Sequence, residues 1–153
     1  KPRVDWELLK KHSKGLIALS GCLNGDIPEA ILAGNDDRIK EMIERFQDTF
    51  GKNNFFLELQ DHPTIPQQKK VNEALIHLHE KYKIPVVVTA DTHYVNPTDN
   101  EAQDIMICIQ SVKNLSDTNR LSMMDADYSM RDPKELYEIF KEPSNSRFYS
   151  FEY

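Results

Sequence analysis

The stretch Val86-Val87-Val88-Thr89-Ala90-Asp91-Thr92-His93-Tyr94 decides the fold, because it joins a strand pattern to a pair of reactive side chains. A short β-branched apolar run is typical of a strand buried on both faces of a parallel sheet. Side chains two positions apart on a strand share a face, so Asp91 and His93 should converge if the chain stays extended. The carboxyl end of such a strand is where α/β enzymes place metal ligands and acid or base groups. Because Asp-x-His is a weak motif, a turn-capping Asp91 and a surface His93 fit the pattern equally well.

Working outward from this strand, the sequence predicts that strands and helices alternate. Strands are expected at residues 15–21, 54–60 and 86–91. Helices are expected at residues 6–11, 26–33, 36–50 and 66–81, and from about Pro97 through an apolar pattern at Ala102, Ile105, Met106 and Ile109. This alternation predicts an α/β fold with a parallel sheet or barrel. Three strands are too few to close a barrel, and all three look buried on both faces, so the sequence indicates a piece of something larger.

Length, composition and charge narrow the class of protein. A chain of 153 residues with 39% hydrophobic residues has room for one domain with a real core. It contains no apolar stretch that could span a bilayer and no apolar signal region at its amino end, so we expect a soluble, cytoplasmic protein without membrane partners. The net charge of −6 argues against a surface that tracks nucleic-acid phosphates without help from elsewhere.

The two cysteines, Cys22 and Cys108, do not show the spacing of a zinc knuckle. In the expected intracellular setting a disulfide between them is not predicted. Cys108 lies inside the apolar helical pattern and is expected in the core.

Four phrases, at residues 15–23, 56–60, 84–94 and 109–111, together carry a resemblance to a known family. In order and rough spacing they resemble the polymerase-and-histidinol-phosphatase (PHP) domain at the amino end of the bacterial replicative DNA polymerase III alpha subunit. The resemblance runs from about Gly15 to Phe140. It implies a distorted (β/α)7 barrel, of which residues 1–140 would be the later part, with 141–153 an irregular tail.

The resemblance also implies site residues. Asp91 and His93 match the family's final ligand pair, which would also be catalytic, and Cys22 matches a mid-domain position that holds a ligand in metal-binding members. The ion would be zinc or manganese, with magnesium a further possibility. The family's opening His-x-His motif has no counterpart in this sequence.

The remaining candidate side chains have simpler interpretations. His77 and His79 lie about 200° apart around a helix and cannot converge on one ion, so we expect solvated helix residues. His12 and His62 are expected on the surface. Glu58, on a buried strand, needs a partner and is a weaker site candidate.

The function implied by the resemblance belongs to a larger protein, a DNA-directed DNA polymerase. In metal-binding members the domain resembles a 3′–5′ exonuclease that proofreads the polymerase's product. The implied partners are DNA, reached through the full-length protein, and replisome subunits such as the sliding clamp and a proofreading subunit. The isolated chain is expected to be inactive. Two alternatives stay open: a free-standing phosphoesterase acting on a small phosphorylated metabolite, and a non-catalytic replisome platform.

Overall fold

The computed structural model describes residues 3–141, which form two compact units. The first unit contains residues 3–60 and 66–88, and the second contains residues 61–65 and 89–141. No helix in the described range is long and apolar enough to cross a membrane. The expected tail at 141–153 lies outside the described residues except for Lys141.

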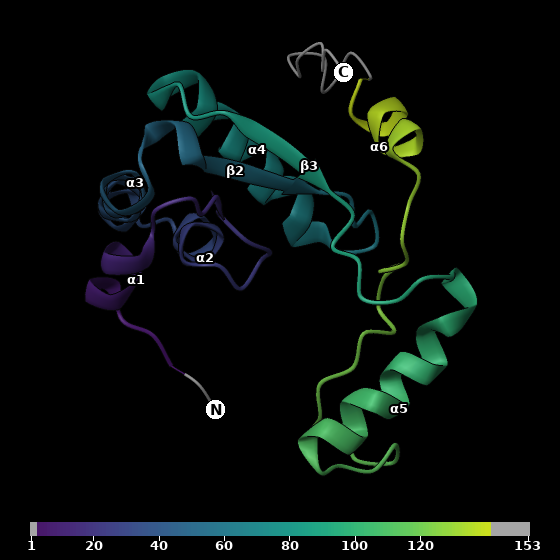
Figure 1. Ribbon diagram of the computed structural model, residues 1–153. Coiled ribbons are helices and arrows are strands. Elements are labelled where there is room, and N and C mark those ends of the chain that lie inside the picture. Colours follow the sequence, from purple (N-terminus) through teal and green to yellow (C-terminus); the bar gives the residue numbers. More distant parts are fainter. Residues whose placement is uncertain (1–2, 142–153) are drawn as a thin grey trace. The chain divides into compact units, whose positions relative to one another are not determined.

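The first unit is built on a sheet with the strand order β1 (Ala18–Leu19), β2 (Phe55–Gln60) and β3 (Val86–Thr89). β1 pairs in parallel with β2, Ala18 opposite Phe55, and the arrows of β2 and β3 run the same way in Figure 1. The central strand carries the core, because Phe55, Leu57 and Leu59 are fully buried. The three strands and the α/β class are therefore confirmed, whereas membership of a distorted (β/α)7 barrel, of which this would be a part, stays an expectation.

Four helices accompany this sheet, and their ends follow local sequence signals. They are α1 (Trp6–His12), α2 (Asp26–Ala33), α3 (Asp36–Phe50) and α4 (Pro66–Tyr82), with a 3-10 turn η1 (Lys52–Asn54) after α3. α2 ends at Gly34, whose φ of 66° is the left-handed conformation that glycine adopts without strain. The N-cap of α3 is Asn35, whose side chain accepts a hydrogen bond from the Arg38 N–H.

The prediction of a long, buried first strand is wrong. β1 has only two residues, and Leu16, Ile17 and Leu19 are all exposed. β3 is only half-buried along its length. In the described part of the chain β1 has a single neighbouring strand, β2, so nothing in the sheet covers its other edge.

The second unit contains η2 (Pro97–Asp99), which continues directly into α5 (Asn100–Ser111), and α6 (Pro133–Phe140), which follows a long irregular segment. Asn96 and Asp99 form a capping box just before α5, in which the side chain of each residue accepts a hydrogen bond from the backbone N–H of the other. After α5 the chain returns to the segment that follows β3, where Tyr94 and Ser129 form an isolated parallel bridge.

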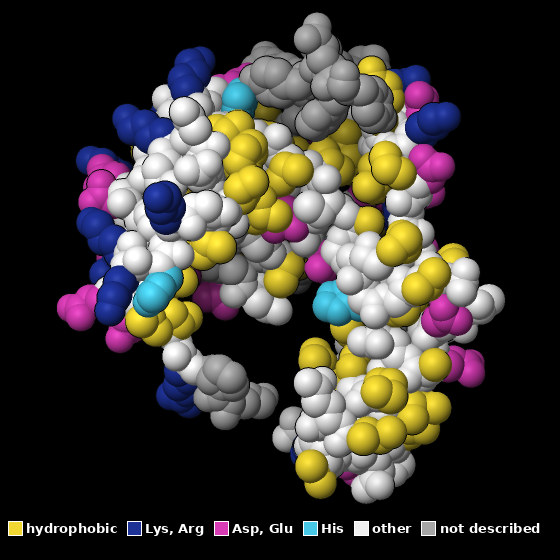
Figure 2. Space-filling view, in the orientation of Figure 1, with side chains coloured by type: hydrophobic (Ala, Val, Ile, Leu, Met, Phe, Trp, Pro, Cys, Tyr) yellow, Lys and Arg dark blue, Asp and Glu magenta, His cyan; other side chains and the backbone are white. Residues whose placement is uncertain are grey.

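The apolar face predicted for α5 is the exposed face. Ile105, Met106 and Ile109 are between 45% and 67% exposed, and Figure 2 shows hydrophobic side chains gathered over this helix. The buried positions are Asp104, Ile107 and Cys108. Asp104 faces inward because Arg120 binds both its carboxylate oxygens, at 2.6 and 2.7 Å, and Ser122 Oγ donates to Oδ1 at 2.8 Å. Cys108 is buried, as predicted.

The C-terminus of α5 generates a stability prediction. Val112 has a φ of 55°, the Lys113 N–H donates to the Cys108 carbonyl as in a Schellman motif, and the valine side chain is 90% exposed. A β-branched residue is strained in this conformation, so Val112→Gly should raise the free energy of unfolding by about 1 kcal/mol. Chemical denaturation measures this. As a control, Ile109→Gly at an exposed helical position should lower the free energy of unfolding by about 1 kcal/mol. Equal effects of the two glycine substitutions would contradict the strain assigned to Val112.

The Asp104 cluster predicts an acid-sensitive contribution to stability. The bond to Arg120, helped by that to Ser122, holds the pKa of Asp104 below its usual 3.8, although burial opposes the shift. A depressed pKa in the folded state stabilises the fold at pH above 3.8, and this contribution is lost as the pH falls through the folded-state value. Asp104→Asn should therefore destabilise the protein most at neutral pH. The difference in the free energy of unfolding between this variant and the wild type should become smaller below about pH 4. Denaturation between pH 7 and pH 3 tests this, with the exposed Asp48→Asn as control; a constant gap would rule the linkage out.

Candidate functional site

The candidate site lies in the second unit, where the chain leaves β3. Asp91 has a φ of 49°, so the backbone turns there instead of remaining extended. Aspartate is among the few side chains that tolerate this left-handed conformation. Asp91 Oδ1 nevertheless lies 3.4 Å from His93 Nε2, so the two predicted residues do converge, through a turn and not through strand alternation.

A third residue, His62, joins this pair. Its Nε2 atom lies 3.4 Å from Asp91 Oδ2, and its side chain is 3% exposed, against 40% for His93. The expectation of a surface histidine at position 62 is therefore wrong. A sequence signal was available: His62 follows the end of β2 by two residues, just as Asp91 follows the end of β3, and positions after strand ends are where sites gather in parallel sheets.

The ring of Tyr128 packs against both histidines. Its centroid is 4.7 Å from that of His62 and 5.7 Å from that of His93, the latter edge to face. The Tyr128 carbonyl accepts the His93 N–H at 2.9 Å, and the Tyr128 hydroxyl donates to Asp125 Oδ1 at 3.1 Å. Burial, with the Asp125 carboxylate nearby, raises the pKa of Tyr128. The phenol therefore stays protonated and the ring is held in place.

The electrostatics of the site favour an ionised carboxylate. The His62 side chain is the main cause that lowers the pKa of Asp91, and the charge of His93 acts in the same direction against the opposing effect of burial. On either side of Tyr128 in the sequence, the Ser129 N–H donates to Asp127 and lowers the pKa of that carboxyl as well. The site thus presents negative charge and imidazole nitrogen together, which is a donor combination suited to a divalent cation.

Hydrogen bonds hold the turn at residues 61–65 in place on both sides of His62. Arg131 Nη1 donates to Asp61 Oδ2 at 2.8 Å, and Thr64 Oγ1 donates to the Asp125 carbonyl at 2.8 Å. The His62 carbonyl also accepts the N–H of Ile65 within the turn. These bonds fix the backbone that carries the imidazole.

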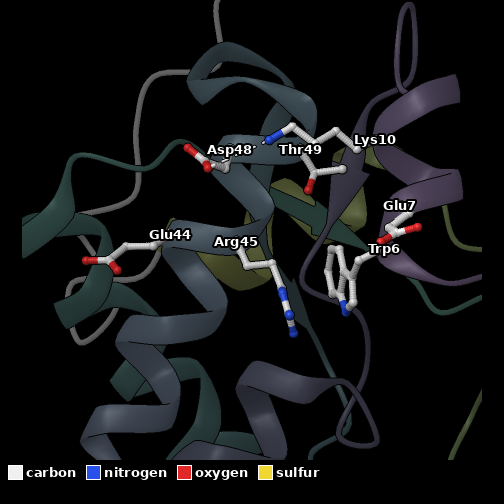
Figure 3. A pocket seen from close by; sticks show the side chains of 7 residues that line it. All are labelled: Trp6, Glu7, Lys10, Glu44, Arg45, Asp48 and Thr49. Carbon is white, nitrogen blue, oxygen red and sulfur yellow. Dashed lines mark ion pairs between the residues drawn. The ribbon is translucent and has the colours of Figure 1, made fainter.

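A separate groove in the first unit has a different character. It has a volume of about 540 Å³ and lies between α1 and α3, with Arg45 stacked 5.1 Å from the Trp6 ring centroid (Figure 3). Its charged side chains are of both signs, namely Glu7, Lys10, Glu44, Arg45 and Asp48. Mixed, largely exposed charges of this kind belong to a helix packing surface and provide no concentrated field for a ligand.

Comparisons with known proteins agree with the sequence phrases. Residues 1–62 match the family model of the PHP domain. The DNA polymerase III alpha subunit of Treponema pallidum is 41% identical over 140 residues, 92% of this chain, and that of Thermus aquaticus is 38% identical over 142 residues, 93% of this chain. This chain is homologous to part of the DNA polymerase III alpha subunit. It spans only 12% of the length of either relative.

The PHP resemblance inferred from sequence is thereby confirmed, and PHP domains are generally metal-dependent. The family-model match ends at His62 and includes Cys22, whereas Asp91 and His93 lie beyond it. Their roles as ligands therefore stay predictions.

The fit of these residues to a metal ion is partial. Asp91 and His93 offer an ionised carboxylate and an imidazole side by side. Within residues 3–141, however, no group of three or more His, Cys, Asp or Glu side chains is arranged to hold an ion. Cys22 is a half-buried free thiol on the loop after β1, and it belongs to the first unit.

The other candidates largely keep their structural interpretations. Glu58 is buried on β2 and accepts a hydrogen bond from Gln60 Nε2 at 3.3 Å. His12 is exposed, and His77, also exposed, lies near Glu80 on α4. His79 was expected to be solvated, but it is half-buried and its Nδ1 contacts the Ile84 carbonyl beyond the end of the helix.

The turn at Asp91 gives a prediction about backbone strain. Asp91→Gly and Asp91→Ala both remove the carboxylate, but only alanine keeps a Cβ in the left-handed conformation. The glycine variant should therefore be more stable than the alanine variant by about 1 kcal/mol. Urea denaturation of the two proteins compares them directly, and equal stabilities would show that the positive φ carries no strain.

Proposed function

We propose that this chain supplies part of a metal-dependent phosphodiesterase centre in a replicative DNA polymerase alpha subunit, with Asp91 and His93 as metal ligands and catalytic residues. The observation that carries the proposal is the ionised Asp91 carboxylate within 3.4 Å of His93 Nε2, on the turn that follows a parallel-sheet strand. The homology to alpha subunits supports the larger assignment.

The chemistry would be 3′–5′ removal of nucleotides from a DNA end. A bound divalent ion, zinc, manganese or magnesium, would lower the pKa of a water molecule and neutralise charge on the scissile phosphate. Asp91 would bring negative charge to the ion, and His93 would bring an imidazole nitrogen on a ring that packs against Tyr128. Cys22 is retained as a ligand on the strength of the family resemblance, and a thiolate would bias its position towards zinc.

The proposed partners follow from the alpha-subunit relatives. They are DNA, bound through the whole protein in the cytoplasm, and replisome subunits such as the sliding clamp and a proofreading subunit. The chain's net charge of −6 means that basic DNA-binding surface has to come from other parts of that protein.

A non-catalytic platform is the second candidate. It is favoured by the lack of a three-donor cluster among the described residues. The small-metabolite phosphoesterase is less favoured, because the relatives that match over about nine-tenths of the chain are alpha subunits.

The proposal predicts a separation of activities in the complete alpha subunit that carries this chain. Asp91→Asn removes the anionic charge while keeping a side chain that tolerates a positive φ, so 3′–5′ digestion of a primer end should be abolished. Nucleotide addition should be largely unchanged, because the polymerase centre is expected in another domain. The assay follows a labelled primer with and without nucleotides.

The matched control is His77→Gln, which alters an exposed histidine on α4 and should leave both activities intact. The 153-residue chain alone should bind zinc or manganese weakly and digest no DNA, because two or three ligands do not make a two-ion centre. Digestion by Asp91→Asn at the wild-type rate would reject the catalytic role and leave the platform.

A further inference from the structure

His62 is buried without a hydrogen bond that would account for its burial. Its side chain is 3% exposed, and neither Nδ1 nor Nε2 has a hydrogen-bond partner of acceptable geometry in the described part of the chain. Buried polar nitrogens are normally paired, so such a group needs a reason to be there. The carboxylate oxygen Asp91 Oδ2 lies 3.4 Å from Nε2, slightly beyond the distance of a well-formed hydrogen bond.

The surroundings of His62 hold the ring where such a bond can form. The backbone is fastened through Asp61 to Arg131 and through Thr64 to the Asp125 carbonyl. The ring packs on Tyr128 at a centroid distance of 4.7 Å. Because the His62 ring is held in place, it can fix the orientation of a side chain that bonds to it.

Each oxygen of the Asp91 carboxylate faces a different histidine. Oδ2 is 3.4 Å from His62 Nε2, and Oδ1 is 3.4 Å from His93 Nε2. A donor on Oδ2 fixes the rotation of the carboxylate and leaves Oδ1 on the side of His93. Ligating carboxylates are commonly oriented by hydrogen bonds of this kind.

We propose that His62 is a positioning residue that donates from Nε2 to Asp91 Oδ2 and so aims Oδ1 at the ion held with His93. The inference rests on the proposed metal role of Asp91 and His93. It does not make His62 a ligand, which agrees with the finding that no three-donor group is formed within residues 3–141.

The first test is made on the metal-free chain and does not depend on the proposed function. Long-range ¹H–¹⁵N NMR of the histidine rings should show His62 as the neutral tautomer protonated at Nε2, and the Nε2–H signal should move in Asp91→Ala. His77, exposed on α4, serves as the reference ring in the same spectra. A His62 tautomer protonated at Nδ1, or a His62 signal that ignores Asp91→Ala, would overturn the positioning role.

The second test compares two replacements of His62 by titration with Zn²⁺ alone. His62→Gln keeps an amide donor, whereas His62→Leu fills the space without one. Loss of a group that orients a ligand typically weakens metal binding about 10- to 100-fold, so the leucine variant should show this loss and the glutamine variant should restore most of the affinity. Thermal melts of both variants identify any that fail to fold, and the NMR test then decides alone.

The outcomes separate this inference from the proposed function. If Asp91→Asn and His93→Ala leave Zn²⁺ binding unchanged, the metal role of the pair fails, whatever His62 does. If those two variants lose binding but His62→Leu and His62→Gln both bind as wild type does, only the positioning role fails. Zn²⁺-induced shifts of the His62 nitrogens typical of direct ligation would also overturn it, because His62 would then be a ligand.

Discussion

The carboxylate of Asp91 between the imidazoles of His62 and His93 is the contact on which the second unit's arrangement depends. It brings together the turn at residues 61–65 and the segment after β3, which are separated in the sequence by the whole of α4. Tyr128 packs on both histidine rings and so adds a third segment to the same point. Without Asp91 the two rings would have no common anion, and a buried imidazole would be left with fewer compensating contacts.

Buried and half-buried ion pairs organise the second unit. Helix α5 buries the carboxylate of Asp104 against Arg120 beside the apolar Ile107 and Cys108. Its Ile105 and Met106 face outward, which departs from the pattern of an ordinary amphipathic helix. Arg131 plays a similar part at the turn by binding Asp61. Ion pairs of this kind fix geometry more than they add stability, because desolvation offsets much of their attraction. A unit organised in this way suits a site whose side chains have to be held in defined positions.

The sequence predicts the first unit well because its signals are local. Gly34 and Gly51 end helices at positions where the backbone has a positive φ. The buried apolar positions of α3 repeat with a helical period, and β2 is buried almost throughout, as predicted. The predictions that failed depend on distant residues. The inward face of α5 is chosen by Arg120, which no helical period reveals, and the burial of His62 is set by Tyr128 and Asp91. Leu16 and Ile17 were predicted to lie in a buried strand, yet they are exposed and precede the two-residue strand β1, which has one described neighbouring strand.

The candidate site shows the same division between local and distant causes. Asp91 and His93 were predicted to converge from the pattern after a β-branched run, and they are close. They do not converge by alternation along an extended strand, because the chain turns at Asp91 with a positive φ. Strain of this kind persists only where surrounding contacts outweigh it, and it is concentrated at functional sites. Here the outweighing contacts are those of the carboxylate with its two histidines. If the carboxylate is what holds the turn, the conformation that places His93 beside it and the charge that attracts a cation have a single origin in Asp91.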